Sequence, residues 1–514
     1  MAQTSENTFT FHSENPASAA SEQNSILLIY TGGTIGAVPS DRNDPKSPLN
    51  IAKWHEFEAG VKDEFDILRK SGIRIDAVAL ERPLDSTNIE PLLWAIFVDI
   101  IAQHYKNYMG FVILHGTDTM VFTAAALSFM LVGLSKPVVI TGSQIPILDH
   151  PNTDGTRNLV NSITVAAWRV TNLPCVPEVC IAFDKVLIRG NRARKFDANA
   201  LGGFQSPNFP PLGTLQDRIS IDSSLLWPPS SDFSPRRRLN PNVIALQIFP
   251  GIQNSPVLGQ CFSVPDLRAV VLGAYGTGNA PTADTFLDSI EGAITDGKII
   301  MDVTQCFRGT VMLGQYETGI GLMKRGVLSG FDITPEAALC KLMVLLGREE
   351  MSDSVEKYLQ RSLVGEQSEN VYASEFTRPE GASWSLSKAG DRLDLVQSTH
   401  DTHWNKSRVS SAWLHLHNGK ISSTEGSVRF EIYFNLDPDI EPNQELKGFA
   451  ADVKKQPVSE PSFISFEVTK GVNAQQPGLP PKITLVLRSQ ADVSFTGATL
   501  LVFTNERTQL ETGH

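Results

Sequence analysis

The sequence predicts an α/β fold with a mostly parallel sheet in two subdomains, followed by an antiparallel β-sandwich at the carboxyl end. Three observations predict it. Short apolar runs alternate with helical patterns up to about residue 365, as they do in parallel α/β sheets. Beyond that point helical periodicity stops, and short alternating runs separated by turn-forming residues take over. A chain of 514 residues also exceeds the size of one ordinary domain.

The expected strands are short apolar runs that end at glycine-rich or polar turns. The first run, Ile26 to Tyr30, leads into a glycine-rich loop, which is typical of a buried parallel strand. Two helices are expected, one after Asn88 with Pro91 in its first turn, and one with Thr334 as its N-cap. Six further runs of the same kind are Phe111 to Leu114, Val138 to Thr141, Val179 to Phe183, Val243 to Ile248, Ala269 to Leu272 and Ile299 to Val303.

Changes in composition divide the chain into four parts. The amino-terminal stretch is polar, with few large apolar side chains, and is expected to be disordered. The alternation of strands and helices fades between Leu212 and Asn240, where prolines and three consecutive arginines indicate a connector. We therefore expect a disordered tail at 1–24, a first subdomain at 25–225, a second subdomain at 240–365 and a β-sandwich at 370–508.

Charge and composition argue against several classes of protein. A net charge of −12 at pH 7 argues against a nucleic-acid partner, because binding to phosphates depends on Lys and Arg. No run approaches the ~20 apolar residues that a membrane helix needs, and the amino terminus lacks the pattern of a secretory signal. We therefore expect a cytoplasmic protein without nucleic-acid or membrane partners. Five scattered cysteines fit reduced thiols better than a disulfide framework or a zinc site.

The loop after the first expected strand is the first candidate for chemistry. It reads TGGTIG from Thr31 to Gly36, so glycines allow a sharp turn and two hydroxyls stand above the strand end. The loop lacks both the Gly-Lys-Ser/Thr ending of a phosphate loop and the G-x-G-x-x-G pattern of a dinucleotide site. A plain turn after a strand remains the alternative, and the loop alone does not exclude it.

A second strand opens into HGTDTM from His115 to Met120, where the hydroxyl of Thr117 adjoins the carboxylate of Asp118. Such a pair can orient a hydroxyl for proton transfer or bind an ammonium group. His115 is a possible base. A histidine packed beneath the loop is the better interpretation, because Thr117 and Asp118 supply the chemistry without it.

A third segment, Val186 to Lys195, places three arginines near Lys195 in an acidic protein. One interpretation is a solvated basic loop. The other is a lysine held beside other cations and a carboxylate, where it helps to deprotonate a threonine or a water. Spacing alone does not decide between them.

Together these three segments resemble the L-asparaginase family across residues 25 to about 365. TGGTIG and HGTDTM look like the two signatures of the family, and Pro83 to Thr87 looks like its substrate-binding turn. The resemblance is to the bacterial cytoplasmic branch (type I) of the family. That assignment rests on KPVVITGSQIP at 136–146, RGNRARK at 189–195, SPNFPPL at 206–212, YGTGNAP at 275–281 and TQC at 304–306.

The resemblance implies a hydrolase that converts L-asparagine to L-aspartate and ammonia, with no metal and no organic cofactor. By the same resemblance, Thr34 is the nucleophile that attacks the side-chain amide and forms a β-aspartyl ester. Thr117, Asp118 and Lys195 match the second catalytic group of the family, in which the lysine and the aspartate polarise the threonine that assists proton transfer.

The resemblance also implies how the substrate is held and how the protein assembles. Asp85, Ser86 and Thr87 would bind the α-ammonium and α-carboxylate groups of the substrate, with help from Asp118. The family forms intimate dimers that pair into tetramers, so a homodimer or homotetramer is expected. Asn279 would then reach into the site of a neighbouring subunit.

The sequence departs from the family pattern in the loop after the first signature. The family usually supplies a tyrosine there to activate the threonine, but Ala37 to Asn50 contains none, and Lys46 is a candidate to replace it. Three alternatives to an asparaginase stay open. They are a glutaminase or glutaminase-asparaginase, the amidase subunit of a tRNA-dependent amidotransferase, and an amino-acid-binding sensor that has lost turnover.

Overall fold

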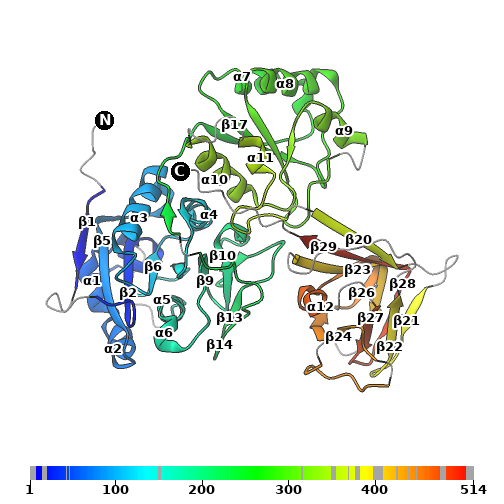
Figure 1. Cartoon of the computed structure of the whole chain (residues 1–514), viewed down its shortest axis with the longest axis horizontal. Helices are drawn as coiled ribbons and strands as arrows, with labels where there is room; N and C mark the ends of the chain where they lie inside the picture. The colour runs from blue at the N-terminus through cyan, green and yellow to red at the C-terminus, as the bar shows by residue number, and fades with distance from the viewer. Residues whose placement is uncertain are drawn as a thin grey trace. The chain divides into compact units, whose positions relative to one another are not determined.

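The computed structural model describes most of the chain, which divides into two compact units, Met1–Gln367 and Ser368–His514 (Figure 1). Each unit is described by itself. None of the helices in the described part of the chain is long and apolar enough to cross a membrane. The described residues are 7–13, 20–41, 43–44, 47–148, 152–230, 232–313, 317–348, 355–368, 370–376, 383–396, 409–423, 427–437, 439–446, 449–474 and 482–504.

A nine-stranded sheet forms the framework of the first unit. Its central strands run parallel from β5 to β9, and antiparallel strands flank them at both edges. In spatial order the strands are β1 (Phe9–His12), β5 (Arg74–Leu84), β2 (Ser25–Gly32), β6 (Gly110–Leu114), β8 (Val138–Thr141), β9 (Val179–Phe183), β10 (Val186–Arg189), β13 (Gly213–Leu215) and β14 (Ile219–Ile221).

Apolar side chains on both faces of this sheet are covered. Every residue of β2 is buried, and Ile26 and Leu28 pack in one core with Phe57 and Phe65. The intervening Leu27 faces the opposite side of the strand and is buried as well. Both faces of the central strand β2 are therefore buried, as expected for a parallel strand between two helical layers. The helices of this part are α1 (Trp54–Gly60), α2 (Lys62–Lys70), α3 (Pro91–His104), α4 (Met120–Met130), α5 (Gly155–Ala166) and α6 (Trp168–Thr171).

A four-stranded parallel sheet forms the second part of the first unit, in the order β16 (Val243–Gln247), β17 (Ala269–Ala274), β18 (Ile299–Thr304) and β19 (Leu328–Ser329). The helix expected after Thr334 is confirmed, because the Thr334 hydroxyl accepts a hydrogen bond from the Ala337 amide at its first turn. The helices here are α7 (Pro256–Phe262), α8 (Asp284–Thr295), α9 (Glu317–Lys324), α10 (Pro335–Leu346) and α11 (Val355–Leu359).

Short elements carry the loops between these layers. The small two-stranded pairs are β3 (Ala37–Pro39) with β4 (Leu49–Ile51), β7 (Leu131–Val132) with β15 (Ser234–Pro235), and β11 (Arg194–Lys195) with β12 (Phe204–Gln205); the 3-10 turns are η1 (Thr34–Gly36), η2 (Ser86–Asn88), η3 (Gly190–Arg192) and η4 (Ile252–Asn254).

The expectation that residues 1–24 are disordered is wrong for β1. This strand pairs antiparallel with β5 along the edge of the sheet. Beyond its end, Ser13 Oγ donates to Asp76 Oδ1 over 2.7 Å, and Tyr108 Oη donates to the other oxygen of the same carboxylate over 2.9 Å. A polar composition therefore does not exclude order here, because hydrogen bonds fix this segment to the sheet.

The expectation of a mostly parallel sheet is wrong for the first sheet, which is mixed. The reason lies partly in short connections. Only Asp184 and Lys185 separate β9 from β10, and a return to a parallel neighbour needs a crossover of a dozen or more residues. The two strands therefore form an antiparallel hairpin, and β13 and β14 extend it in the same antiparallel sense.

The second unit consists of two antiparallel sheets that share one apolar core. Leu414 and Leu500 come from one sheet, and Phe430 and Leu485 come from the other. The short alternating runs expected beyond about residue 365 form strands in the described part of this unit. The strands are β20 (Asn370–Phe376), β21 (Trp384–Leu386), β22 (Arg392–Val396), β23 (Val409–Ser422), β24 (Val428–Phe434), β25 (Phe449–Lys455), β26 (Val458–Glu467), β27 (Lys482–Leu487), β28 (Asp492–Phe495) and β29 (Gly497–Thr504), with one helix, α12 (Thr469–Ala474).

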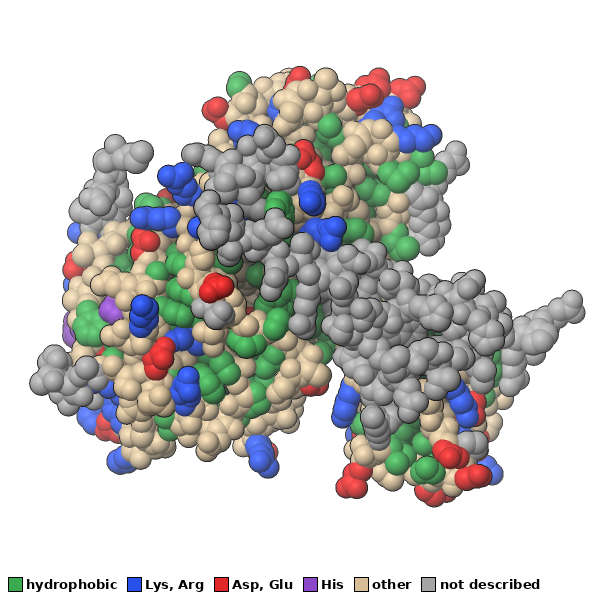
Figure 2. All heavy atoms as spheres, in the orientation of Figure 1, with side chains coloured by type: hydrophobic (Ala, Val, Ile, Leu, Met, Phe, Trp, Pro, Cys, Tyr) green, Lys and Arg blue, Asp and Glu red, His purple; other side chains and the backbone are tan. Residues whose placement is uncertain are grey.

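The described surface mixes charges of both signs. Figure 2 shows Lys and Arg side chains interspersed with Asp and Glu over the described part of the face in view, and neither sign gathers into a continuous band. The net charge of −12 is therefore not concentrated in one acidic patch on this face.

The boundary between the two units leads to a first prediction. Leu363, Glu366, Gln367 and Ser368 are buried, so a protease has little access to their backbone. Limited proteolysis is expected to cut between Ser368 and Ser383 and to leave a folded fragment that contains the whole first unit. Mass spectrometry of the fragments is the measurement. A first cut amino-terminal to Leu363, or a fragment that unfolds on release, would contradict the prediction.

Candidate active site

Three loops that carry candidate residues meet at one edge of the first sheet. They follow β5, β2 and β6, which are adjacent and parallel. Because parallel strands end at the same edge, their loops gather there, and this edge is where α/β sheets place ligands. The loops contain Asp85 to Thr87, Thr31 to Gly36, and His115 to Thr119.

Glycines allow these loops to touch. Gly33 has φ 79°, a left-handed conformation, and a Cβ on it would lie 2.3 Å from the Gly116 amide nitrogen. A Cβ on Gly116 would in turn lie 2.5 Å from Ser86 Oγ. The Gly33 amide also donates to Leu84 O over 3.0 Å, at the end of β5. The three loops are therefore in direct contact, and larger side chains at Gly33 and Gly116 would force them apart.

Thr34 lies at the start of η1, directly after the double glycine, and is half-buried. Its hydroxyl makes no hydrogen bond within the described residues. The neighbouring Thr31 differs, because its hydroxyl donates to Leu114 O over 2.8 Å beneath the loop. Of the two threonines in this loop, Thr34 is thus the one whose hydroxyl is available to a substrate.

Lys195 joins the second signature to a distant part of the chain. Its Nζ donates to Thr117 Oγ1 over 2.9 Å and to Asp118 Oδ1 over 2.6 Å. Thr117 is buried and the lysine side chain is 16% exposed, whereas the Asp118 side chain is 57% exposed. A cation therefore sits against a threonine oxygen at the bottom of the site, and the carboxylate faces outward. No hydrogen bond within the described residues joins this group to Thr34.

The turn expected to bind substrate is tied to the same group. The Asp118 amide donates to Ser86 Oγ over 3.3 Å, and Thr119 Oγ1 donates to Ser86 O over 2.7 Å. Asp85 caps η2 by accepting from the Thr87 amide over 2.9 Å. Asp85 and Thr87 are exposed and Ser86 is buried. The turn therefore presents a carboxylate and a hydroxyl to the solvent side of the site.

The arginines near Lys195 are not turned toward it, because each forms an ion pair with a carboxylate elsewhere in the unit. The segment is not a solvated loop either, since Arg189 and Arg192 are almost fully buried. The arginines instead fix the backbone that leads to Lys195. Glu178 lies 11 residues before Arg189, whereas Asp332 and Glu336 lie 140 and 142 residues from their arginines, so the sequence gave no local signal for those two pairs. The pairs are Arg189 with Glu178, Arg192 with Asp332, and Arg194 with Glu336.

The family's loop tyrosine has no counterpart among the described residues of the loop after the first signature. Tyr30 is close in sequence, but its hydroxyl donates to Ala52 O over 2.7 Å in the core. Burial raises the pKa of Tyr30 well above its usual value, so it cannot act as a base. Lys46 lies outside the described residues. In the described part of the chain, no group of three or more His, Cys, Asp or Glu side chains could hold a metal ion.

His115 packs beneath the loop, as the better of its two interpretations predicts. Trp94 Nε1 can only donate, and it donates to Thr123 Oγ1 over 3.0 Å. Gly116 O can only accept, so His115 Nδ1 carries the proton and donates to it over 2.6 Å. In the neutral ring Nε2 is then the acceptor, and the Thr123 hydroxyl, 2.9 Å away, donates to it. Burial lowers the pKa of His115 to about 4, so the ring is neutral at pH 7 and supports the loop without titrating.

This burial gives a second prediction, on stability against pH. In the unfolded chain His115 has an ordinary pKa near 6.5, whereas in the folded protein the pKa is about 4. Between these values only the unfolded state binds the proton. The contribution of His115 is therefore complete above pH 6.5 and falls by about 3 kcal/mol as the pH falls to 4.

Replacing His115 by Asn, which keeps a donor for Gly116 O, is expected to flatten the fall in unfolding free energy between pH 6.5 and 4. Chemical denaturation at several pH values is the measurement, with His55→Asn at an exposed position as the control. An unchanged slope in H115N would contradict the prediction.

Comparisons with known proteins agree with this architecture. Two family models match the chain, "Asparaginase, N-terminal" over residues 25–226 and "Glutaminase/Asparaginase C-terminal domain" over residues 242–359. L-asparaginase 1 of Escherichia coli (strain K12) is 38% identical over 353 residues, which are 67% of this chain and 98% of that protein. The 60 kDa lysophospholipase of Mus musculus is 37% identical over 369 residues, 68% of this chain and 64% of that protein.

A solved structure extends the comparison to the fold. L-asparaginase I from Vibrio cholerae superposes with a TM-score of 0.60 at 36% identity, covering 67% of this chain and 99% of that structure. The matches account for the first unit, in which the three loops and Lys195 lie. The chain therefore belongs to the asparaginase family.

Proposed function

We propose that the protein is an L-asparaginase, which hydrolyses L-asparagine to L-aspartate and ammonia. The observation that carries the proposal is the group formed by Lys195, Thr117 and Asp118, placed beside the loop of Thr34 at one strand edge. The names of the Escherichia coli and Vibrio cholerae relatives support the same substrate.

In the first half of the proposed reaction, Thr34 Oγ attacks the side-chain amide carbon of asparagine. The oxygen–carbon bond forms, the carbon–nitrogen bond breaks, and the hydroxyl proton leaves with the amine as ammonia. The product on the protein is a β-aspartyl ester of Thr34. An alcohol is a poor nucleophile at neutral pH, so a positioned proton acceptor has to assist this step. The glycine-rich turn brings backbone amides close to the amide oxygen, where negative charge develops.

In the second half, water attacks the ester carbon, and the bond to Thr34 Oγ breaks to release aspartate. Thr117 is suited to pass the proton, because the Lys195 ammonium 2.9 Å from its oxygen stabilises negative charge there. Asp118 in turn holds Lys195 in place through the 2.6 Å contact. The pair therefore polarises the threonine without itself becoming covalently modified.

Substrate binding is assigned to the turn after β5 and to Asp118. The exposed carboxylates of Asp85 and Asp118 suit the α-ammonium group, and the hydroxyls of Ser86 and Thr87 suit the α-carboxylate. An ammonium group lies between two carboxylates more favourably than a neutral group does, which favours an amino-acid substrate over a simple amide.

The proposal extends to the rest of the chain. The two antiparallel sheets of the second unit form a β-sandwich, a module added to the asparaginase fold. The protein is cytoplasmic and assembles as a homodimer or homotetramer, like the family that it resembles. Asn279, whose Oδ1 accepts from Thr318 Oγ1 over 2.7 Å, would contribute to a neighbour's site in that assembly.

The direct test is ammonia release by the purified full-length protein. Saturable release from L-asparagine, with a lower kcat/KM for L-glutamine, is expected. A higher kcat/KM for glutamine would make the protein a glutaminase. A lysophospholipid is tested beside it by the release of fatty acid, because its ester hydrolysis yields no ammonia and the mouse relative is named a lysophospholipase. Binding of asparagine without any ammonia release would favour the alternative of an amino-acid sensor.

The assignment of the nucleophile gives a further prediction. Replacing Thr34 or Thr117 by Ala is expected to lower kcat by about 10²-fold or more, because each removes a group used in the reaction. Only Thr34 is expected to carry the covalent adduct. An electrophilic asparagine analogue that acylates asparaginases, followed by peptide mapping, should label the peptide with Thr31 to Gly36 in the unchanged protein and in T117A.

The same analogue should leave T34A unlabelled. Label found on Thr117, with T34A still modified, would mean that the two threonines have the opposite roles. Circular dichroism of each variant is the control for folding.

A further inference from the structure

The last residues of the first unit lie against the run that leads to Lys195. Arg192 Nε donates to Gly365 O over 2.7 Å, and Arg189 Nη1 lies 3.5 Å from the same oxygen. Asn191 Nδ2 donates to Val364 O over 3.1 Å. Three of the four residues from Arg189 to Arg192 thus bind the backbone of a segment more than 170 residues away.

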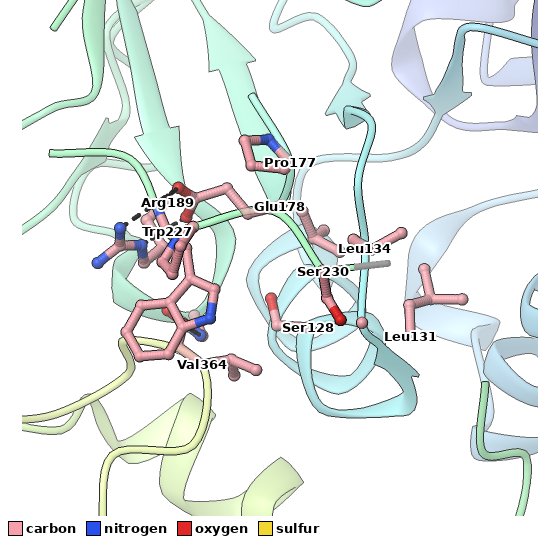
Figure 3. Close-up of a pocket in the computed structure, with 13 residues that line it drawn as sticks. Ser128, Leu131, Leu134, Pro177, Glu178, Arg189, Trp227, Ser230 and Val364 are labelled. Carbon is pink, nitrogen blue, oxygen red and sulfur yellow. Dashed lines mark hydrogen bonds and ion pairs between the residues drawn. The ribbon is translucent and has the colours of Figure 1, made fainter. Parts of the chain in front are cut away.

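Arg189 cannot move away from this contact at low cost. It is 3% exposed, forms an ion pair with Glu178, and donates to Leu225 O over 2.7 Å. Figure 3 shows its guanidinium group beside the Glu178 carboxylate and the Trp227 ring, at the wall of a small cavity that Val364 also lines. Its side chain is therefore fixed from several sides.

The segment on the other side of the contact is fixed as well. The carboxylate of Glu366 accepts from the amides of Leu363 and Val364, and it pairs with Lys341 over 2.7 Å. Glu366 and Lys341 are both fully buried. This buried ion pair and the hydrogen bonds to Glu366 hold the backbone of the segment in one geometry, because separating the pair would leave a buried charge without a partner.

We propose that the segment Leu363–Gln367 is a positioning element for Lys195, and this inference rests on the proposed function. Three residues after Arg192, Lys195 reaches Thr117 and Asp118. A shift of the Arg189–Arg192 run would move the lysine relative to the threonine oxygen, 2.9 Å away. Displacements of about 1 Å in a catalytic group can cost 10²-fold in rate. The segment touches neither substrate nor reacting atoms, so its effect passes through the run.

The chain offers a matched pair of glycines for the test. Gly365 and Gly297 both have φ 82° and lie in the same unit, so Ala at either position causes the same kind of backbone strain. A Cβ on Gly365 would lie 2.6 Å from Arg189 Nη1, whereas one on Gly297 would have no atom within 4 Å. The two variants therefore differ in whether the new Cβ clashes with Arg189.

Gly365→Ala in the full-length protein is expected to lower kcat at least about tenfold, with KM changed less than about twofold, because three of the four proposed substrate-binding residues, Asp85 to Thr87, have no hydrogen bond with the run among the described residues. Gly297→Ala is expected to leave kcat and KM unchanged. A milder variant, Asn191→Ala, removes the contact with Val364 without a clash, and its kcat is expected to fall between those of G297A and G365A. Turnover is measured per active site, titrated with the acylating analogue, well below each melting temperature.

The possible results separate this inference from the proposed function. Equal kcat values in G365A and G297A would overturn the positioning role. A rise in KM that accounts for the whole loss of kcat/KM in G365A would overturn it as well. If G365A does not fold, an unchanged kcat in N191A would overturn it. If the wild-type protein releases no ammonia from asparagine, the proposed function itself is contradicted.

Discussion

The parallel pairing of β5, β2 and β6 is the constraint on which the site depends. It brings the turn at Asp85, the loop of Thr34 and the second signature to one edge, and Gly33 and Gly116 let them touch there. Without that contact the hydroxyls on the three loops would not lie close together. Lys195 comes from β11, 78 residues after Thr117 in the sequence, and its Nζ bonds the Thr117 oxygen at this edge. Fold and chemistry are joined at that hydrogen bond.

Much of this could be predicted from the sequence, because the strands and glycines that build the edge have local signals. Ile26 to Tyr30 is apolar without interruption, and the double glycine follows it directly, so strand and turn are both visible in one window. The helix after Thr334 is visible for the same reason, through its cap and proline. The prediction that failed, a disordered amino-terminal segment, depended on contacts between residues far apart in the sequence. β1 is held by its pairing with β5, and Ser13 beyond its end bonds Asp76; both partners lie over 60 residues away, and no property of the first residues announces them.

The arginines around Lys195 show the same limit in the site. Their spacing predicts a cluster of positive charge, yet each arginine is neutralised by a carboxylate from another element. With the arginines paired to carboxylates, Lys195 is the cation of this run that bonds the Thr117 oxygen. The structure therefore changes the interpretation of the run. The run is fixed by ion pairs to carboxylates elsewhere in the unit, and the cation that contacts Thr117 is Lys195.

The contacts that brace the run before Lys195 also determine where the first unit ends. A boundary drawn by composition near residue 365 would cut off Glu366 and Gln367, although neither is exposed. Glu366 pairs with Lys341, and Gln367 accepts from the same ammonium group over 2.8 Å. Removing them would leave a buried cation with fewer partners, which is among the costlier changes a core can undergo. Hydrogen bonds rather than composition thus define the unit, and they extend it through Gln367 because the run before Lys195 is braced against that last segment.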